Sequence, residues 1–456
     1  MKNTLTFLFV LFSICSCLRN TDDNGTFNRT PQDLVAGQTV SIEEAENTLL
    51  SFLGTEAETR VSNKTITSRY SLGGRNNDTR SDTEEDTPYV HVFNFGEDEG
   101  YAIVSGDRRV PPILCLTDEG SLHQGDSINN IGSLIMLSGI DTKYRLLTGL
   151  PVINSNGDTV VLRSEIDTSG MNNPEIDPSL YSYYYYDWET TNSNGAILAC
   201  QWDQESPFSD YCLTESGDPS YAGCTAVAVG QIMYHWGLSH DTNGRFWDWP
   251  LMRTITMHNS SGTYSWHRVK TLLRTLGDAE NLDADYGSEE TPADINNAPR
   301  TFINFGFSSG GTLQDYNYSI LCQNLYYGPA LGSGSAIMQV TQTYILGFLV
   351  NTHYHYTNKH TWVYDKCLTK RRRVDIYYDN VFQHSYYEYQ NLIHCNFGLR
   401  STSGDTSTYL RANGYYLSPY FDLTQGPVMR STITTTYGTE NYYQYQLKMN
   451  CGIRGE

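Results

Sequence analysis

The chain has 456 residues and a formal net charge of -21, so it is long enough for two or more domains, each with its own core. The excess of acidic residues excludes the extended basic surface that nucleic-acid binding needs, and we expect no nucleic-acid partner. The 35 tyrosines and 38 glycines favour strands joined by long loops, within the α+β class.

Residues 1–17 have the pattern of an export signal, because a short basic start precedes an apolar run that is too short for a permanent membrane helix. The run ends in Ile14-Cys-Ser-Cys17, which resembles a bacterial lipobox with Cys17 as the acylated residue. Cleavage nearby without lipidation is the alternative. Residues 18–37 are polar and are expected to form a flexible tether. We therefore expect a secreted protein or an outer-membrane or cell-surface lipoprotein, with membrane contact only through the lipid.

The first folded unit is predicted over residues 38–195. Its elements, in chain order, are expected to be a helix within 40–53 capped by Ser41, a hairpin of Tyr89–Phe95 and Tyr101–Ser105, short strands at Val110–Leu114 and Ser121–Leu122, and a helix over 131–147. Residues 169–195 are rich in Asn, Ser, Pro and Tyr, and this composition marks the boundary of the unit. The second and larger unit is predicted to span residues 196–456.

The most informative segment of the second unit opens with Tyr221-Ala-Gly-Cys224 and continues as a small, apolar run to Met233. This run predicts a buried helix that begins at Cys224 and stops at Gly237. The first N–H groups of a helix have no partner within it, so together with the helix dipole they lower the pKa of a thiol placed there. Cys224 is therefore a candidate nucleophile, although most free cysteines are simply buried and inert.

A cysteine nucleophile needs a base that is itself held in place. His360 opens the alternating, strand-like run His360-Thr-Trp-Val-Tyr-Asp365, which predicts a rigid position for its imidazole. Farther along, Asn396 offers an amide to accept the ring N–H, and Phe397 offers a cover for that bond. Upstream, Gln204 is an uncharged donor suited to an oxyanion hole beside the Cys224 backbone N–H.

Taken in order, these segments resemble the streptopain family of papain-fold cysteine peptidases. The motifs are Gln201-Trp-Asp-Gln-Glu-Ser-Pro-Phe208, Gly223-Cys-Thr-Ala-Val-Ala-Val-Gly-Gln-Ile-Met233, His360-Thr-Trp-Val363, His394-Cys-Asn-Phe-Gly398 and Asn413-Gly-Tyr-Tyr-Leu417. The run Gly100-Tyr-Ala-Ile-Val-Ser-Gly-Asp-Arg108 is similar to the inhibitory pro-segment of that family. The resemblance covers residues from about 38 to the C-terminus.

The resemblance implies a papain-like domain, with a central helix against a twisted antiparallel sheet, behind a mixed pro-domain that blocks its cleft. It implies Cys224 as nucleophile, His360 as general acid and base, Gln204 as oxyanion donor and Asn396 as support of the histidine. Further supporting residues are Phe397, Trp362 and Gly223. The expected substrates are proteins or peptides, cleaved without a metal or other cofactor, with an apolar residue preferred just upstream of the cleaved one.

Two positions depart from the family pattern beside the histidine, where Lys359 replaces Gly and Thr361 replaces Ala. Small residues let a substrate backbone approach closely, so Lys359 is expected to narrow the cleft or to reshape the specificity. The cover over the histidine is also thinner, because Leu399 stands where the family has a second Trp. None of these changes removes a group that transfers a proton.

Other interpretations stay open from the sequence alone. His353, His355 and His360 form a candidate zinc site, although a carboxylate ligand and an HExxH helix are missing from it. A catalytically degenerate surface lipoprotein that binds or inhibits is the non-enzymatic alternative. Beyond Cys15 and Cys17, the remaining cysteines are even in number, and pairs such as Cys200 with Cys212 are conceivable in an exported protein.

Overall fold

The computed structural model describes residues 38–54, 65–73, 88–96, 98–128, 130–148, 152–153, 159–160, 180–288, 290–335, 344–346, 348–350, 359–399, 412–418, 432–435, 438–441 and 447–455. The α-helices are α1 (Ile42–Leu53), α2 (Ile131–Thr148), α3 (Cys224–Trp236), α4 (Trp249–Met252), α5 (Thr263–Leu276), α6 (Ala298–Asn304) and α7 (Tyr318–Leu325), with a short 3-10 turn at Ile295–Asn297. The large sheet contains β1 (Ile66–Gly73), β2 (Pro88–Phe95), β3 (Tyr101–Ser105), β4 (Ile113–Thr117), β8 (Tyr181–Tyr185), β9 (Glu189–Gly195), β10 (Ser309–Asp315), β11 (Ala330–Ser335), β14 (Lys359–Tyr378), β15 (Val381–Asn396), β16 (Gly414–Leu417) and β19 (Lys448–Arg454). Smaller pairings involve β5 (Ser127–Ile128), β6 (Val152–Ile153), β7 (Thr159–Val160), β12 (Tyr344–Ile345), β13 (Phe348–Val350), β17 (Thr432–Thr435) and β18 (Gly438–Asn441).

One sheet runs through both predicted units. Its main path has the order β1-β2-β3-β4-β16-β15-β14-β11-β19-β10, and neighbouring strands along this path are antiparallel. The two units meet where β4 pairs with β16, through Thr117 opposite Gly414 and Cys115 opposite Tyr416. The N-terminal unit is thus added to an edge of the C-terminal sheet by main-chain hydrogen bonds.

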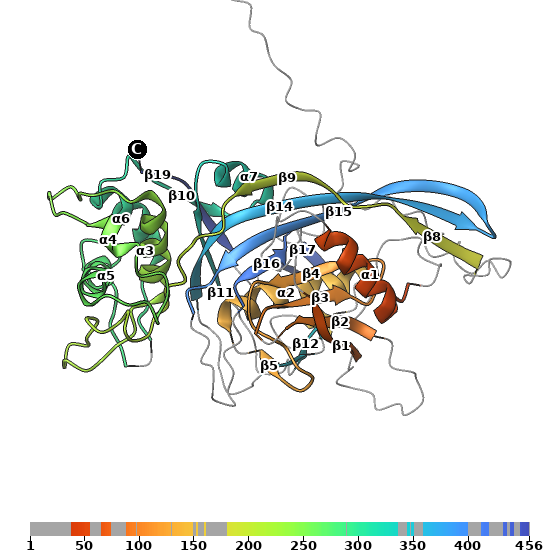
Figure 1. Cartoon of the computed structure of the whole chain (residues 1–456), viewed down its shortest axis with the longest axis horizontal. Helices are drawn as coiled ribbons and strands as arrows, with labels where there is room; N and C mark the ends of the chain where they lie inside the picture. Colours follow the sequence, from red (N-terminus) through yellow and green to blue (C-terminus); the bar gives the residue numbers. More distant parts are fainter. Residues whose placement is uncertain are drawn as a thin grey trace, which may run out of the picture.

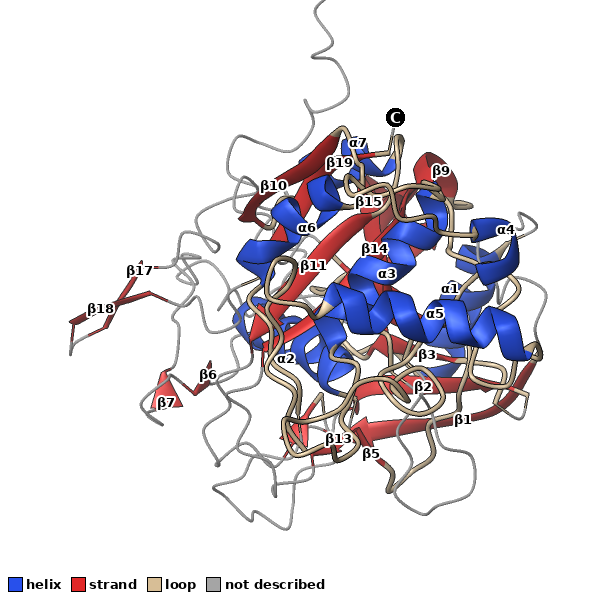
Figure 2. Cartoon of the chain, turned by 90° about the vertical axis from the view of Figure 1, so that its left-hand side faces the viewer, coloured by secondary structure: helices blue, strands red, loops and turns tan. Residues whose placement is uncertain are grey.

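Two hydrophobic cores lie on opposite faces of this sheet. Because side chains alternate along a strand, Trp362 and Tyr364 of β14 enter the core shared with α1, α2 and β1–β4, whereas Val363 enters the core formed with α3, α5 and α6. Figure 2 shows α3 and α5 in front of the strands, and Figure 1 shows the N-terminal elements gathered beneath the long β14–β15 ribbon. The predicted α+β class, with a central helix on an antiparallel sheet, is confirmed.

Most elements predicted for the N-terminal unit are present. Ser41 caps α1 by accepting a hydrogen bond from the Glu44 N–H at 3.2 Å, and β2 and β3 form the expected hairpin. The strand predicted from Val110 begins only at Ile113, because the preceding prolines have no N–H to donate to a ladder. The strand predicted at Ser121–Leu122 is wrong, since both backbone groups of Leu122 bond instead to the side chain of Asn94.

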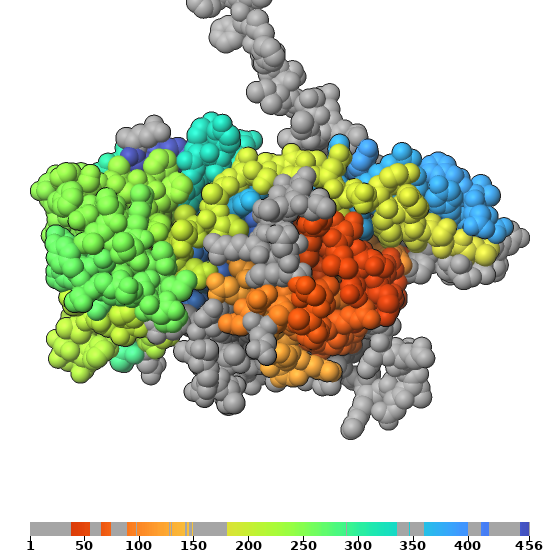
Figure 3. Space-filling view, in the orientation of Figure 1, coloured from red at the N-terminus to blue at the C-terminus, as the bar shows by residue number. Residues whose placement is uncertain are grey.

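The segment predicted as a boundary continues in strand form over its described part. Strands β8 and β9 follow one edge of β14, with Tyr185 opposite Val374 and Gly195 opposite Lys366. In the space-filling view this segment forms a strip on the surface that runs from the β14–β15 hairpin toward the helices of the C-terminal unit (Figure 3). The described part of this segment, residues 180–195, therefore lies on the surface, where main-chain bonds to β14 hold it.

Among the described helices, none has the length and apolar character needed to cross a membrane. The cysteines at described positions are all free thiols, so the suggested pairing of Cys200 with Cys212 is not formed. Both side chains are buried, and burial raises the pKa of the Cys212 thiol to about 11. These thiols therefore behave as small core residues.

Candidate active site

Helix α3 places Cys224 at its first residue, as the sequence predicts. Its residues from Thr225 to Tyr234 are buried, and the helix ends at Gly237, whose left-handed backbone lets its N–H bond to the Met233 carbonyl at 2.8 Å. At the other end Gly223 has a φ of 86° and supplies no side-chain cap, so it does not occupy the N–H groups at the start of the helix. Cys224 is half-buried, in contrast to the other described cysteines, which are buried.

The imidazole of His360 lies beside the Cys224 thiol. Strand β14 holds His360 opposite Gly334 of β11, and the side chain is buried. Its Nε2 atom is 2.9 Å from the carbonyl oxygen of Phe397, which must be the acceptor of this bond. The Nε2–H bond to this carbonyl leaves Nδ1 as the nitrogen available to the thiol.

The pKa of Cys224 reflects this contact. Burial alone raises it, but the hydrogen bond and the charge of His360, the backbone of Thr361 and the hydroxyl of Thr225 together lower it to about 7. A thiol with this pKa is substantially a thiolate at neutral pH, which is the reactive form of cysteine. The structure thus brings together the nucleophile and base that the sequence predicts.

The role predicted for Asn396 needs correction, because its amide does not reach His360. It donates to the carbonyl of Cys200 at 2.9 Å and to the Oε1 atom of Gln231 at 3.0 Å. Gln231 is fully buried in α3, and its Oε1 also accepts from the Trp202 N–H at 3.2 Å. Strand β15 ends at Asn396, and it is the carbonyl of the next residue, Phe397, that accepts the hydrogen bond from the His360 ring.

Gln231 is a residue that the sequence reasoning missed as part of the site. It lies two turns after Cys224 on α3, and its amide pair with Asn396 ties the helix of the nucleophile to the strand that leads to Phe397. A polar side chain in an otherwise apolar helix was the available signal, because a buried amide requires partners.

The remaining predicted residues lie around this pair. The carbonyl of Gln204 accepts a hydrogen bond from the Ala222 N–H at 2.9 Å, which places Gln204 next to the segment that enters α3. Trp362 is fully buried, and its ring lies 6.2 Å from that of His360 and 5.8 Å from that of Phe397. At Gly223 a Cβ atom would lie 2.9 Å from the Thr291 carbonyl oxygen, so the site requires glycine there for space as well as for φ.

Thr361, one of the two departures from the family pattern, has a partner in this chain. Its hydroxyl lies 3.1 Å from the hydroxyl of Thr225, and both side chains are buried. The residue after the nucleophile therefore bonds to the residue after the base. The side chain of Lys359, the other departure, lies outside the described part of the structure, as do His353 and His355 of the zinc alternative. The described residues contain no cluster suited to a metal ion.

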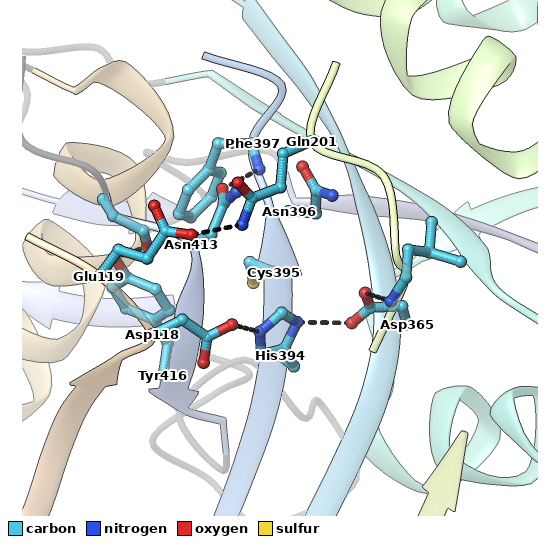
Figure 4. A network of polar contacts seen from close by, with 12 residues as sticks. Asp118, Glu119, Gln201, Asp365, His394, Cys395, Asn396, Phe397, Asn413 and Tyr416 are labelled. Carbon is cyan, nitrogen blue, oxygen red and sulfur yellow. Dashed lines mark hydrogen bonds and ion pairs between the residues drawn. The ribbon is translucent and has the colours of Figure 1, made fainter. Parts of the chain in front are cut away.

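The N-terminal unit reaches the same region from the other face. At Gly132, in the first turn of α2, a Cβ atom would lie 2.1 Å from the Cδ1 atom of Phe397, so the helix backbone lies directly on that ring. Nearby, Asp118 contacts His394 of β15, and Glu119 accepts from the Gln201 amide at 2.8 Å (Figure 4). The sequence placed His394 in a family motif without giving it a role, and it did not single out Asp118.

Comparisons with known proteins agree with this arrangement. Residues 202–406 match the Peptidase C10 family, and residues 37–139 match the Spi protease inhibitor. Over 228 residues the chain is 26% identical to the thiol protease/hemagglutinin PrtT of Porphyromonas gingivalis, a match that covers 45% of this chain and 24% of that protein. The chain thus matches about a quarter of the length of this relative.

Two solved structures from Prevotella intermedia are also similar. A fragment of prointerpain A matches 85% of this chain and 99% of its own length, with 16% identity and a TM-score of 0.44. The active wild-type interpain A cysteine protease matches 62% of this chain and 98% of its own, with 17% identity and a TM-score of 0.35.

The family matches place a Peptidase C10 region in the C-terminal part of the chain, with a Spi-type inhibitor region ahead of it. Its C-terminal unit is a Peptidase C10 domain and its N-terminal unit is a Spi-type inhibitor domain, so the resemblance to the streptopain family is confirmed. We define the inhibitor domain as the described residues within 38–148, and the peptidase domain as those from 196 to 455.

Proposed function

We propose that this protein is a cysteine endopeptidase made as a zymogen, with Cys224 as nucleophile and His360 as general acid and base. The observation that carries the proposal is the contact of the two side chains at the start of α3, where the pKa of the thiol falls to about 7. A cysteine kept only for packing has no need of a base, and burial would raise its pKa.

The reaction follows from the positions of these two groups. The Cys224 thiolate attacks the carbonyl carbon of the peptide bond, and the C–S bond forms as the carbonyl oxygen takes the electron pair. Protonated His360 then gives its proton to the leaving amine as the C–N bond breaks, which leaves an acyl-enzyme. In the second half His360 takes a proton from water, the hydroxide attacks the acyl group, and the thiolate is released.

The negative oxygen of each tetrahedral intermediate needs donors that are already in place. The backbone N–H of Cys224 at the start of α3 is one, and we assign the Gln204 side chain as the second. Support comes from the hydrogen bond between the Gln204 carbonyl and Ala222, which keeps that residue close to the nucleophile. The Phe397 carbonyl keeps the His360 ring oriented through both half-reactions.

We further propose that the inhibitor domain blocks the peptidase domain until the connection between them is cut. The contact of Gly132 with Phe397 supports this, because α2 packs against the residue whose carbonyl orients the base. We also propose that residues 1–17 direct export and that Cys17 carries the lipid. Mass analysis of the mature N-terminus, with Cys17→Ala as the comparison, would detect or refute the acyl group.

The test of activity uses residues 18–456 in three forms: wild type, Cys224→Ala and, as a matched loss of a different thiol, Cys212→Ala. Each is incubated with unfolded casein, and both casein cleavage and the mass of the chain are followed. We expect wild type and Cys212→Ala to cleave casein and Cys224→Ala to be inert. If Cys224→Ala cleaves casein as fast as wild type, the assignment is wrong. If none of the three cleaves it, even after the connection is cut by an added protease, the degenerate-lipoprotein alternative replaces this proposal.

A further inference from the structure

A buried cluster of charged side chains joins the two domains, and it contains neither Cys224 nor His360. Asp118 belongs to the inhibitor domain, whereas Asp365 on β14 and His394 on β15 belong to the peptidase domain. Figure 4 shows the imidazole of His394 between the two carboxylates. All three residues are almost completely buried, with relative exposures of 3%, 1% and 1%.

Strand pairing brings Asp118 to this place. It follows β4 directly, and β4 is the strand by which the inhibitor domain pairs with β16. The ladder continues one residue beyond the strand, because the Asp118 N–H donates to the Asn413 carbonyl at 3.0 Å. The side chain is therefore delivered to His394 only when the inhibitor domain is docked in the correct register.

The cluster requires a charged histidine. Nδ1 of His394 lies 2.5 Å from Oδ1 of Asp365, and Nε2 lies 3.1 Å from Oδ2 of Asp118. Carboxylates only accept hydrogen bonds, so both ring nitrogens must carry a proton to donate to both. Burial opposes this charge, but the charges of Asp365 and Asp118 and the hydrogen bonds with both outweigh it and raise the pKa of His394 to about 9.

The thiols, the histidine and the tyrosine near this cluster do not supply the negative charge that Asp118 gives to His394. The thiols of Cys395 and Cys200 are near Asp365, and burial raises the pKa of both, so they are neutral. His235 is also near Asp365. Burial lowers the pKa of His235, which favours its neutral form. The ring of Tyr415 packs edge-on against His394 with the centroids 5.0 Å apart, and it presents no charge. When Asp118 leaves, one of the two carboxylates facing His394 is lost.

The same cluster also contacts Leu198, near the start of the peptidase domain. The second oxygen of Asp365 accepts the N–H of Leu198 at 2.8 Å, only a few residues after β9. Beside it, Glu119 of the inhibitor domain accepts from the Gln201 amide. The inhibitor domain thus contacts both β15 and the residues that follow β9.

We propose that the His394–Asp365 pair is a docking site of the peptidase domain for an edge strand that ends in a carboxylate, and that its occupant is β4 with Asp118. The buried hydrogen bonds of Asp118 help to hold the inhibitor domain on the peptidase domain. That docking inhibits rests on the proposed function; that docking depends on Asp118 does not.

The test therefore needs no peptidase activity. The full chain carrying Cys224→Ala is compared with the same chain carrying Asp118→Asn as well, and with Asp126→Asn as a partly exposed carboxylate of the same domain. Amide hydrogen exchange is measured for β4 and β16. Loss of a charged hydrogen bond in a buried site is expected to speed exchange there by roughly ten- to hundredfold, with no change for Asp126→Asn. Equal exchange in all three chains would overturn the proposal.

A second measurement guards against a variant that does not fold. The titration of His394 is followed by NMR in the chain with Cys224→Ala alone, and we expect a midpoint near pH 9. Since docking raises this pKa, the stabilisation of docking by Asp118 is complete below the pKa of the undocked enzyme and is lost as the pH rises through about 9. Exchange at β4 and β16, corrected for its intrinsic pH dependence, should therefore accelerate between about pH 8 and 10. A midpoint at or below the ordinary histidine value of about 6.5 would also overturn the proposal.

Discussion

Nε2 of His360 lies 2.9 Å from the carbonyl oxygen of Phe397, so a main-chain group orients the proposed base. A backbone acceptor cannot be removed by changing a side chain, and the amide that the sequence suggests as the partner of His360, that of Asn396, has other partners. The orientation of the base and the packing of α3 on the sheet can therefore be separated by mutation.

The first prediction concerns Asn396→Ala. This change removes the Asn396 amide from the buried side chain of Gln231 and from the carbonyl of Cys200, so the free energy of unfolding should fall by about 1–3 kcal/mol. Because the Phe397 carbonyl still holds the ring, the pH midpoints of kcat/KM should stay where they are in wild type. Denaturant unfolding and a pH profile on a peptide substrate measure the two effects.

Asn391→Ala is the matched control, since Asn391 lies on the same strand and is partly exposed. It should change neither quantity. A shift of the pH midpoints in Asn396→Ala with unchanged stability would mean that the amide acts on His360 after all.

The second prediction concerns the reactivity of Cys224. Its pKa of about 7 implies that alkylation by iodoacetamide in the full chain rises with pH around a midpoint near 7. In His360→Ala the contact that lowers the pKa most is lost, and the midpoint should move toward or above the ordinary value of 9. The exposed His267 supplies the control His267→Ala, for which the midpoint should not change.

Peptide mapping identifies the modified thiol. Burial raises the pKa of Cys212 and Cys451 to about 11 and 12, so neither should react at neutral pH. Modification of several cysteines at equal rates, or the same midpoint with and without His360, would contradict the ion-pair description of the site.

The sequence was sufficient for the parts of the structure that local pattern determines. Helix α3 begins at Cys224 and is closed by Gly237 because an apolar run has a glycine at each end, and the hairpin of β2 and β3 follows from two strand-like runs joined by a short segment with a glycine at each end. The acceptor for His360 was not predictable in the same way. It depends on how the chain turns after Asn396, and period-two alternation does not extend through a turn.

Contacts between residues that are far apart in the chain were the other feature that the sequence could not predict. His394 and Asn396 share a face of β15 by alternation, but nothing local indicates that Asp118, far earlier in the chain, lies opposite His394. Only the pairing of β4 with β16 brings them together. Likewise, the sequence marked Thr361 only as a departure from the family pattern, whereas the structure shows that its hydroxyl bonds to Thr225 across the contact between α3 and β14.

The third prediction tests this threonine pair by a double-mutant cycle. Thr361→Val and Thr225→Val each leave one buried hydroxyl without its partner, and each should lower the free energy of unfolding by about 1 kcal/mol. The double variant removes both hydroxyls, so it should lose clearly less than the sum of the two. Strict additivity would show that the hydroxyls do not interact.

The same variants should differ in the pKa of Cys224. The Thr225 hydroxyl bonds to the thiol, whereas Thr361 acts on it through its backbone. The midpoint of alkylation should therefore rise in Thr225→Val and stay unchanged in Thr361→Val. An equal rise in both would contradict this division of roles.

The fourth prediction concerns Gly132 at the contact of α2 with the active site. Alanine favours a helix by about 1 kcal/mol over glycine, yet its Cβ would lie 2.1 Å from the Phe397 ring, and overpacking of this kind typically costs about 1–3 kcal/mol. We expect Gly132→Ala to loosen the inhibitor domain, so that casein hydrolysis by the full chain begins earlier than in wild type. Ala45→Gly weakens α1 of the same domain by about 1 kcal/mol without touching Phe397, and it controls for general destabilisation. If Gly132→Ala starts no earlier than Ala45→Gly, the contact between α2 and Phe397 does not restrain the enzyme.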